Sequence, residues 1–168
     1  EMCIRDSPLT ALIGFYLGDY WLFTTPFYIF VIIPIVEFLL TRYGIDELET
    51  HRAEKGIHWL FDLMLYLNIL IVFGLLIYSL TKIVSFEFMS IEFLGSLLSL
   101  GLVLASNGIN VAHELCHRTN TPERILGKFL LIPSLYMHFY LEHNYGHHLK
   151  VATKEDPVTA KYLSLIHI

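Results

Sequence analysis

The chain has 168 residues, of which 55% are hydrophobic and only 16% are charged, and its formal net charge is −5. A soluble domain of average composition carries about 25% charged residues. So much apolar side chain excludes an intrinsically disordered protein, and the excess of acidic over basic residues argues against a protein that binds nucleic acid. With 2 cysteines, the chain cannot be a disulfide-stabilised scaffold. The composition leaves an integral membrane protein, or an unusually apolar soluble helical protein.

The two ends of the chain are related at the level of DNA. Codons that can encode residues 163–168 form a strand whose complement encodes residues 2–6 in one frame. One DNA element read from opposite strands would give both peptides, as a sequencing adaptor does when it is translated at both ends of a contig. We therefore expect residues 1–7 and 163–168 to be adaptor-derived, and residues 8–162 to be the natural chain, cut at both ends.

Apolar segments follow one another at about 9–18, 21–41, 60–80 and 91–112. A helix needs about 20 mostly apolar residues to cross the hydrocarbon core. The three later segments are long enough, and the first is interpreted as the tail of a longer helix. Trp21 and Trp59 lie near span ends, where amphipathic rings anchor a helix at the interface. The sequence therefore predicts an all-α integral membrane protein with about four transmembrane helices.

Basic residues alternate with bare segments between these predicted spans. The turn between the first two spans has none, and only Lys82 follows the third. Loops rich in Lys and Arg remain on the cytoplasmic side of a membrane, so the loop 41–58 and the region after residue 112 are predicted to be cytoplasmic. Their basic residues are Arg42, Arg52, Lys55, Arg118, Arg124, Lys128, Lys150, Lys154 and Lys161.

Of the 9 histidines, six lie between residues 113 and 148, and five of these form two boxes. The first box, residues 113–117, reads H-E-L-C-H. Residues four apart share a face of a helix, so His113 and His117 can bind one metal ion. Asn110 lies one turn earlier and could orient His113. Glu114 could act as a base, as a ligand or as the partner of a ligand ring.

The second box, residues 142–148, reads E-H-N-Y-G-H-H. On an α-helix His143 and His147 are about 40° apart, whereas His148 is about 140° from His143. Three ligands to one metal from an unbroken helix are therefore awkward, so either Gly146 breaks the helix or His148 serves a second metal. Glu142 is a further candidate partner of a ligand ring. His138 is interpreted as a hydrogen-bonded core residue. The alternative is that it is itself a metal ligand or the partner of a ligand ring.

Burying five imidazole rings beside a membrane span without a metal would be costly, so the two boxes predict a metal site. Imidazole suits zinc, copper, iron and nickel. The first box alone matches the H-E-x-x-H helix of zinc proteases, but a catalytic zinc takes three protein ligands and a water. Five candidates are too many for one such site, and an iron pair bound by histidines would need more than five. Two metals bridged by the two boxes fit the spacing better than one.

Three runs of sequence carry a specific resemblance: N-V-A-H-E-L-C-H-R at 110–118, Y-M-H-F-Y-L-E-H-N-Y-G-H-H at 136–148 and V-A-T-K-E-D-P at 151–157. Together they closely resemble the bacterial alkane 1-monooxygenases, which are membrane-bound non-haem diiron hydroxylases of the membrane desaturase and hydroxylase superfamily. The dense match covers about fifty residues. The upstream spans match in hydropathy and order only.

The resemblance implies a six-helix membrane bundle with two iron ions at a cytoplasmic histidine-rich site, in the bacterial inner membrane. This chain would hold the first four helices and the first two boxes, and by itself would be inactive. A third histidine box follows in the family's C-terminal half. The implied reaction is terminal hydroxylation of n-alkanes taken from the lipid bilayer, with O₂ and with electrons from rubredoxin and rubredoxin reductase. The implied iron ligands are His113, His117, His143, His147 and His148.

Other readings of the boxes remain open at this point. A fatty acid desaturase, a fatty acid hydroxylase or a xylene-type monooxygenase would share the diiron chemistry. An intramembrane zinc metalloprotease would use the first box and a distant Asp, with no use for His147 and His148. A metal transporter or sensor would line its spans with histidines instead of gathering them at one membrane face.

Overall fold

The computed structural model describes residues 2–42, 58–151 and 153–156. The backbone of these residues forms helices joined by turns, without a strand among them. The chain divides into two compact units, Glu1–Val111 and Ala112–Ile168. The predicted all-α class is confirmed for the part of the chain that the structure describes.

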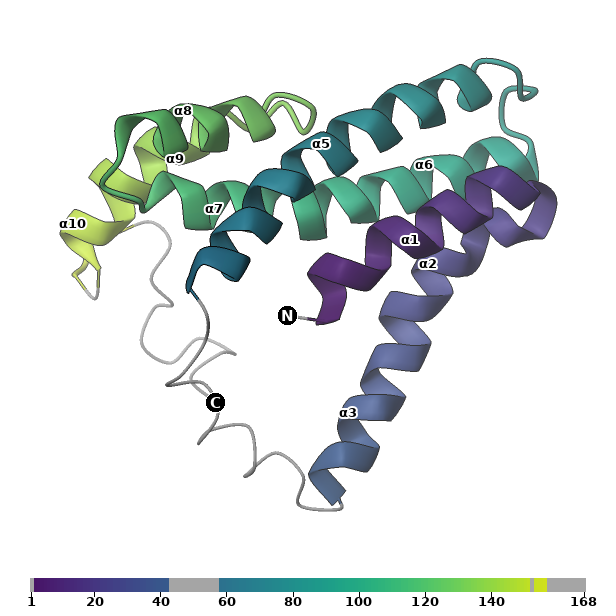
Figure 1. Cartoon of the computed structure of the whole chain (residues 1–168), viewed down its shortest axis with the longest axis horizontal. Coiled ribbons are helices and arrows are strands. Elements are labelled where there is room, and N and C mark those ends of the chain that lie inside the picture. Colours follow the sequence, from purple (N-terminus) through teal and green to yellow (C-terminus); the bar gives the residue numbers. More distant parts are fainter. Residues whose placement is uncertain (1, 43–57, 152, 157–168) are drawn as a thin grey trace. The chain divides into compact units, whose positions relative to one another are not determined.

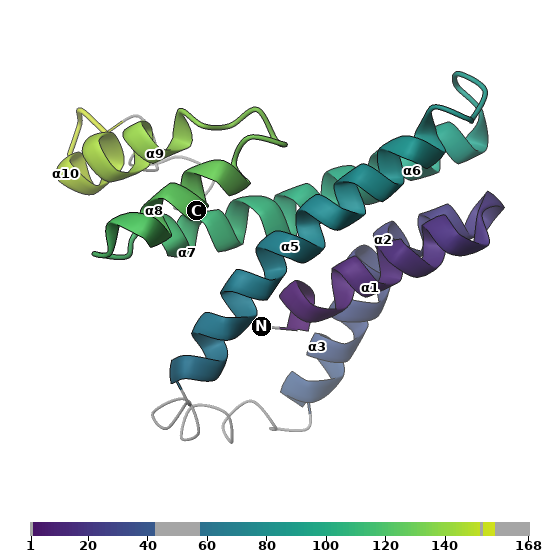
Figure 2. The same ribbon diagram turned by 45° about the horizontal axis from the view of Figure 1, so that its top comes forward.

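In the first unit, the described residues of the predicted apolar segments form helices (Figure 1). Helices α1, α5 and α6 pack against one another, and the 3₁₀ turn η1 packs against α1 and α6 (Figure 2). The elements are α1 (Met2–Leu17), η1 (Asp19–Phe23), α2 (Thr24–Phe27), the π-helix η2 (Tyr28–Ile32), α3 (Ile33–Arg42), α5 (His58–Ile83), α6 (Ile91–Val103), the π-helix η4 (Leu104–Ile109) and the start of α7 (Asn110–Cys116).

Three helical stretches are long and apolar enough to cross a membrane: Asp19–Arg42, Trp59–Ile83 and Ile91–Cys116. They correspond to the predicted spans 21–41, 60–80 and 91–112. The predicted segment 9–18 lies in α1, whose 16 residues are about 24 Å long at the usual rise of an α-helix. That is shorter than the hydrocarbon core, which is about 30 Å thick. Most of the loop 41–58 and all of residues 163–168 lie outside the described part of the chain.

Turn residues separate the helices of the first unit. Gly18 has φ 76 directly after α1, a left-handed conformation that glycine adopts without a Cβ clash. Ser90 precedes α6, and its hydroxyl accepts a hydrogen bond of 3.1 Å from the backbone N–H of Phe93. This is the usual N-cap arrangement, which satisfies one of the free N–H groups at a helix start.

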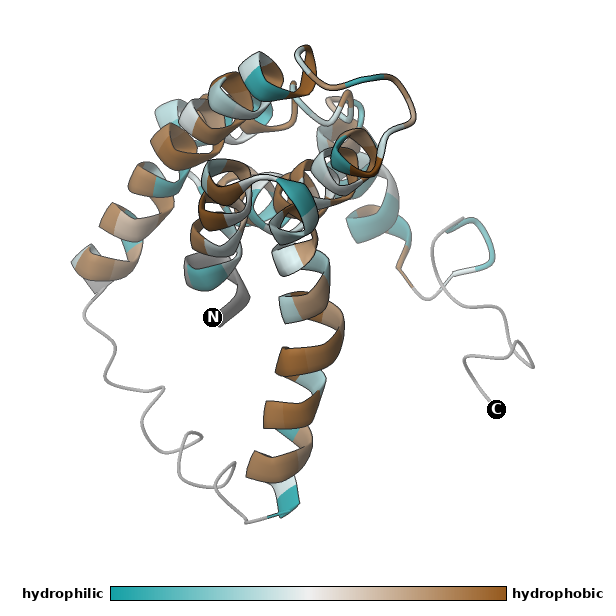
Figure 3. Cartoon of the chain, turned by 90° about the vertical axis from the view of Figure 1, so that its right-hand side faces the viewer, coloured by the Kyte–Doolittle hydropathy of each residue, from teal (hydrophilic) through white to brown (hydrophobic). Residues whose placement is uncertain are grey.

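The core of the first unit is small compared with its apolar surface. One buried cluster consists of Phe15, Leu22, Ile83 and Leu100, and a neighbouring one of Ala11, Leu75 and Val103. Only 17% of the most apolar window of Asp19–Arg42 is buried, and 22% of that of Trp59–Ile83. Figure 3 shows long hydrophobic stretches along these helices. Because such surface is unfavourable in water, lipid is the solvent that accounts for it.

A pair of asparagines joins α5 to η4 inside this unit. Asn68 donates from Nδ2 to the backbone oxygen of Asn107 over 2.9 Å, and Asn107 Nδ2 donates to Asn68 Oδ1 over 2.9 Å. Their residue exposures are 3% and 0%. Polar side chains buried among membrane helices need such partners, since lipid offers none. The pair therefore fixes how α5 meets the π-helical segment.

The second unit begins within the last helical turns of α7 and continues through α8 (Thr121–Leu130), α9 (Phe139–Leu141), the π-helix η5 (Glu142–His147) and α10 (His148–Lys150). Its fully buried side chains include Leu115, Leu130 and Leu131. A Cβ at Gly127 would lie 3.0 Å from the backbone oxygen of Ala112 and 3.0 Å from Leu115 Cβ. The missing side chain thus lets α8 approach α7 closely beneath the first histidine box.

We predict that Asn68→Leu lowers the free energy of unfolding by about 1 kcal/mol, because interhelical hydrogen bonds in membranes contribute about this much. Denaturant unfolding of the protein in detergent micelles, followed by circular dichroism, would measure it. Leu70→Ala is the control, since Leu70 is 72% exposed and its loss should matter little. Strictly additive effects of Asn68→Leu and Asn107→Leu would contradict the pairing, because coupled residues deviate from additivity.

Candidate metal centre

The first histidine box lies at the end of the third spanning helix. His113 is in the last turns of α7, and the backbone N–H of His117 bonds back to the carbonyl of His113 over 3.3 Å. This helical spacing places the two rings on one face, with centroids 4.7 Å apart. The two rings thus lie together on one helix face, and their binding of a metal ion stays a prediction. The span that carries them is the most protein-covered of the three, with 44% of its window buried.

The second box departs from the predicted α-helical geometry. Residues Glu142–His147 form the π-helix η5, in which hydrogen bonds run from i to i+5. A turn that closes at the fifth residue brings residues five apart onto nearly the same face. His143 Nε2 and His148 Nε2 are accordingly 3.0 Å apart. The expectation that His148 lies opposite His143 is wrong, because it assumed the rotation per residue of an α-helix.

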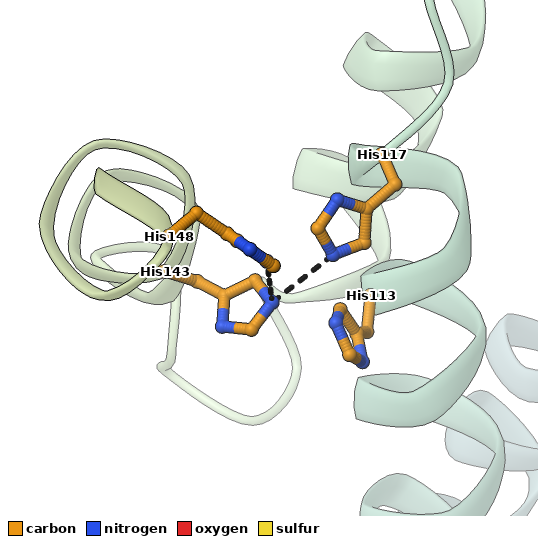
Figure 4. A group of neighbouring side chains, drawn as sticks. All are labelled: His113, His117, His143 and His148. Atoms are coloured by element: carbon orange, nitrogen blue, oxygen red, sulfur yellow. Dashed lines mark hydrogen bonds between the residues drawn. The ribbon is translucent and has the colours of Figure 1, made fainter. Parts of the chain in front are cut away.

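Rings from the two boxes converge on a single point. One nitrogen from each of His113, His117, His143 and His148 lies within 4.8 Å of every other. His117 Nε2 and His143 Nε2 are 3.0 Å apart, and Figure 4 shows the rings of the two segments facing one another. Two nitrogens bound at right angles, each at about 2.1 Å from one metal ion, would be about 3.0 Å apart. The donor set therefore fits a metal ion.

Aromatic packing holds the central ring of this group. Phe139 stacks on His143 with centroids 4.7 Å apart and an angle of 15° between the planes, and it meets the edge of His113 at 5.6 Å. His113 and His143 are half-buried, whereas His117 and His148 are exposed. The group thus has one side shielded by an aromatic ring and one side open.

The electrostatics of the group favour neutral imidazole at His143. Burial lowers the pKa of His143 to about 4, with further lowering by the neighbouring rings of His113, His148, His117 and His147. A ring with this pKa is neutral at pH 7. Neutral imidazole is the form that binds a metal, since a protonated ring has no lone pair to donate.

His147, the fifth predicted ligand, has a different partner. Its Nδ1 lies 2.7 Å from Asp156 Oδ2, and the Asp156 side chain is fully buried. The ring also stacks on His143, with centroids 5.7 Å apart and planes inclined by 30°. His147 therefore adjoins the four-histidine group while its Nδ1 is engaged by a carboxylate.

The supporting residues proposed from the sequence have varied surroundings. Glu114 is exposed and pairs with Arg118 over 3.3 Å. His138 is exposed, so its interpretation as a core residue is wrong. Its ring packs edge-on against Tyr136, with centroids 4.7 Å apart, and it does not belong to the four-histidine group. Asn110 and Glu142 are exposed at the starts of α7 and η5.

Sequence reasoning missed two residues at this site. The roles of Phe139, as the ring stacked on His143, and of Asp156, as the partner of His147, depend on geometry that no periodicity predicts. The V-A-T-K-E-D-P run at 151–157 was distinctive, but it did not identify its acidic residue as a neighbour of a histidine.

Comparison with known proteins agrees with this centre. Residues 90–167 match the fatty acid desaturase family, a stretch that contains both histidine boxes. The chain is 31% identical to alkane 1-monooxygenase 1 of Alcanivorax borkumensis across 161 residues, which are 92% of the chain. The chain is a homologue of alkane 1-monooxygenases. The resemblance predicted from the histidine boxes is thereby confirmed.

Further relatives show where the likeness is densest. The chain is 32% identical to alkane 1-monooxygenase 1 of Pseudomonas aeruginosa over 146 residues, which cover 85% of this chain and 38% of that protein. It is 48% identical to the alkane 1-monooxygenase of Acinetobacter baylyi over 59 residues, or 34% of this chain and 14% of that protein. The chain spans about two fifths of the length of the Alcanivorax and Pseudomonas relatives, 39% and 38% respectively.

We predict that His143→Ala weakens metal binding by more than about 10–100-fold, which is the usual effect of losing a residue that only supports a ligand. The reason is that His143 Nε2 lies 3.0 Å from both His117 Nε2 and His148 Nε2, at the centre of the group. His138→Ala is the matched control and should retain the affinity of the natural protein. Competition between the protein and a chelator for Fe²⁺ measures both. Equal affinities of the two variants would contradict the placement of His143 at the centre.

Proposed function

We propose that the protein containing this chain is an alkane 1-monooxygenase with a histidine-ligated diiron centre. The observation that carries the proposal is the convergence of four imidazole nitrogens, all within 4.8 Å of one another, at the end of a spanning helix. Homology to alkane 1-monooxygenases supports the reaction class. Since the chain spans only part of these relatives, the activity belongs to the whole protein.

The proposed reaction converts R–CH₃, O₂, two electrons and two protons into R–CH₂OH and water. Bound iron would supply the activation of O₂, which amino-acid side chains cannot perform. His113, His117, His143 and His148 would hold metal through their converging nitrogens, and His147 through Nε2. Phe139 would keep water from the stacked face of His143. Further ligands for a second iron would come from the rest of the protein.

The membrane gives a physical reason for an alkane substrate. An alkane has no polar group, so its binding depends on apolar contact alone, and it dissolves in the hydrocarbon core of the bilayer. Helix Ile91–Cys116 ends in the first histidine box, so one element extends from the apolar layer to the metal centre. We propose that the protein lies in the bacterial inner membrane with both boxes facing the cytoplasm, where Lys and Arg are enriched.

Electrons would come from rubredoxin, reduced by its reductase at the expense of NAD(P)H. Basic side chains near the boxes could attract an acidic redox partner. Several of these side chains already have local roles. Arg118 pairs with Glu114 at 3.3 Å, Lys150 pairs with Glu155 at 3.5 Å, and Lys128 Nζ lies 3.8 Å from the Tyr140 ring centroid. Retention on the cytoplasmic side accounts for part of their enrichment.

The protein that contains this chain, in membranes supplied with rubredoxin, its reductase and NADH, is expected to convert n-octane into 1-octanol. The oxygen atom of 1-octanol should come from ¹⁸O₂. His117→Ala should abolish the reaction because it removes a proposed ligand. Gas chromatography with mass spectrometry measures the alcohol and its label. Glu155→Gln, a change at an exposed surface ion pair, is the control and should retain activity.

A second candidate function follows from the family match at residues 90–167, whose description is fatty acid desaturase. That enzyme would use the same metal chemistry on an acyl chain. An unsaturated or hydroxylated acyl product, with no octanol, would favour this candidate over the alkane hydroxylase. One zinc per chain and no iron would contradict both, and would support the protease that the first box alone resembles.

A further inference from the structure

The contact between His147 and Asp156 is a largely enclosed polar contact of the second histidine box. His147 Nδ1 and Asp156 Oδ2 are 2.7 Å apart, the Asp156 side chain is fully buried and that of His147 is 23% exposed. Burying a carboxylate is costly unless hydrogen bonds or charges compensate it. Burying the Asp156 carboxylate against the His147 ring therefore carries a considerable cost in the free energy of folding.

A local fold of the chain brings the two residues together. After α10, the backbone N–H of Thr153 bonds to the carbonyl of Lys150 over 2.9 Å, and the N–H of Asp156 bonds to the carbonyl of Thr153 over 3.4 Å. Successive turns thus return the chain toward η5, so that Asp156 reaches back nine residues to His147. The next acidic residue toward the N-terminus, Glu155, is 77% exposed in its side chain and pairs with Lys150 at the surface.

The chemistry of the contact determines the protonation of the ring. An ionised carboxylate can only accept hydrogen bonds, so His147 Nδ1 must carry the hydrogen. In a neutral ring this leaves the lone pair on Nε2, and Nε2 is then the atom available to a metal. A carboxylate behind a ligand histidine fixes the tautomer, orients the ring and increases the electron donation of the other nitrogen.

We propose that Asp156 is a positioning residue of the metal centre, which holds His147 with Nδ1 protonated and Nε2 available as a fifth ligand. This assigns a role to the V-A-T-K-E-D-P segment at 151–157: it carries the carboxylate that orients the second box. It also explains why His147 stands apart from the four rings whose nitrogens converge. The inference rests on the proposed metal centre.

Three variants of the natural protein that contains this chain test the proposal through Co²⁺ affinity, measured by competition with a chelator. Asp156→Asn keeps an oxygen that accepts from Nδ1–H but loses the charge, so affinity should fall moderately. Asp156→Leu loses both and should cost about 10–100-fold. Glu155→Gln removes the neighbouring surface carboxylate with the same change in net charge, and should leave the affinity unchanged.

A double-mutant cycle separates positioning from a general structural effect. If Asp156 acts through His147, then Asp156→Asn should weaken Co²⁺ binding in the natural background and have no further effect in the His147→Ala background. The visible absorption bands of bound Co²⁺ should shift in both variants, since His147→Ala removes the proposed fifth ligand and Asp156→Leu removes the carboxylate that orients it. Circular dichroism of the metal-free variants reports whether each one folds.

Each outcome bears on one claim. If the natural protein binds no metal, the proposed function is wrong. If the natural protein binds Co²⁺ and the Asp156 variants match its affinity and spectrum, the metal centre stands and the positioning role is wrong. If Asp156→Asn weakens binding equally in the natural and His147→Ala backgrounds, Asp156 acts on the fold and not through His147, which also overturns the inference. Should Asp156→Leu fail to fold, the cycle with Asp156→Asn decides.

Discussion

The metal centre depends on the π-helical winding of residues Glu142–His147. Only because this turn closes at the fifth residue do His143 and His148 present their Nε2 atoms to each other at 3.0 Å. π-turns are rare and occur frequently at functional sites, since an α-helix would be the lower-energy path for the same backbone. A second π-helix, η4, lies in the spanning helix ahead of the first box. There the asparagine pair supplies a side-chain donor to a carbonyl inside the π segment.

Four imidazole rings gathered in this way are poorly satisfied without a cation. Each neutral imidazole has one N–H and one lone pair. His143 Nε2 is shared by His117 Nε2 and His148 Nε2, both at 3.0 Å, so at most one N–H can lie along each contact. Because the pKa of His143 is lowered to about 4, protonation of this ring at pH 7 would not supply the missing hydrogen. A bound metal ion would satisfy the converging lone pairs together, which is the physical argument that the cluster is a metal centre.

Several segments around the histidine cluster hold its rings in position. On one side Phe139 stacks on His143, and on the other the buried Asp156 carboxylate engages His147. Beneath the first box, Gly127 lets α8 approach α7 closely enough for Leu115 to be fully buried. These contacts come from three different segments of the second unit, so the ring positions do not depend on one helix alone. An enzyme that must hold metal ions in fixed geometry benefits from such support, because ligand orientation controls both affinity and reactivity.

The sequence by itself determined the all-α membrane class, the positions of three spans, the placement of His113 and His117 on one helix face and the resemblance to alkane hydroxylases. Hydropathy over about 20 residues and the four-residue spacing of a helix face are local properties, and local properties can be read from a sequence. The tertiary structure decided how the second box presents its rings. The same letters predict His148 far from His143 on an α-helix and beside it on a π-helix. The tertiary structure also decided which side chains are partners, such as Asp156 with His147 and Asn107 with Asn68. Such contacts depend on how turns and helices return the chain upon itself, which periodicity does not encode.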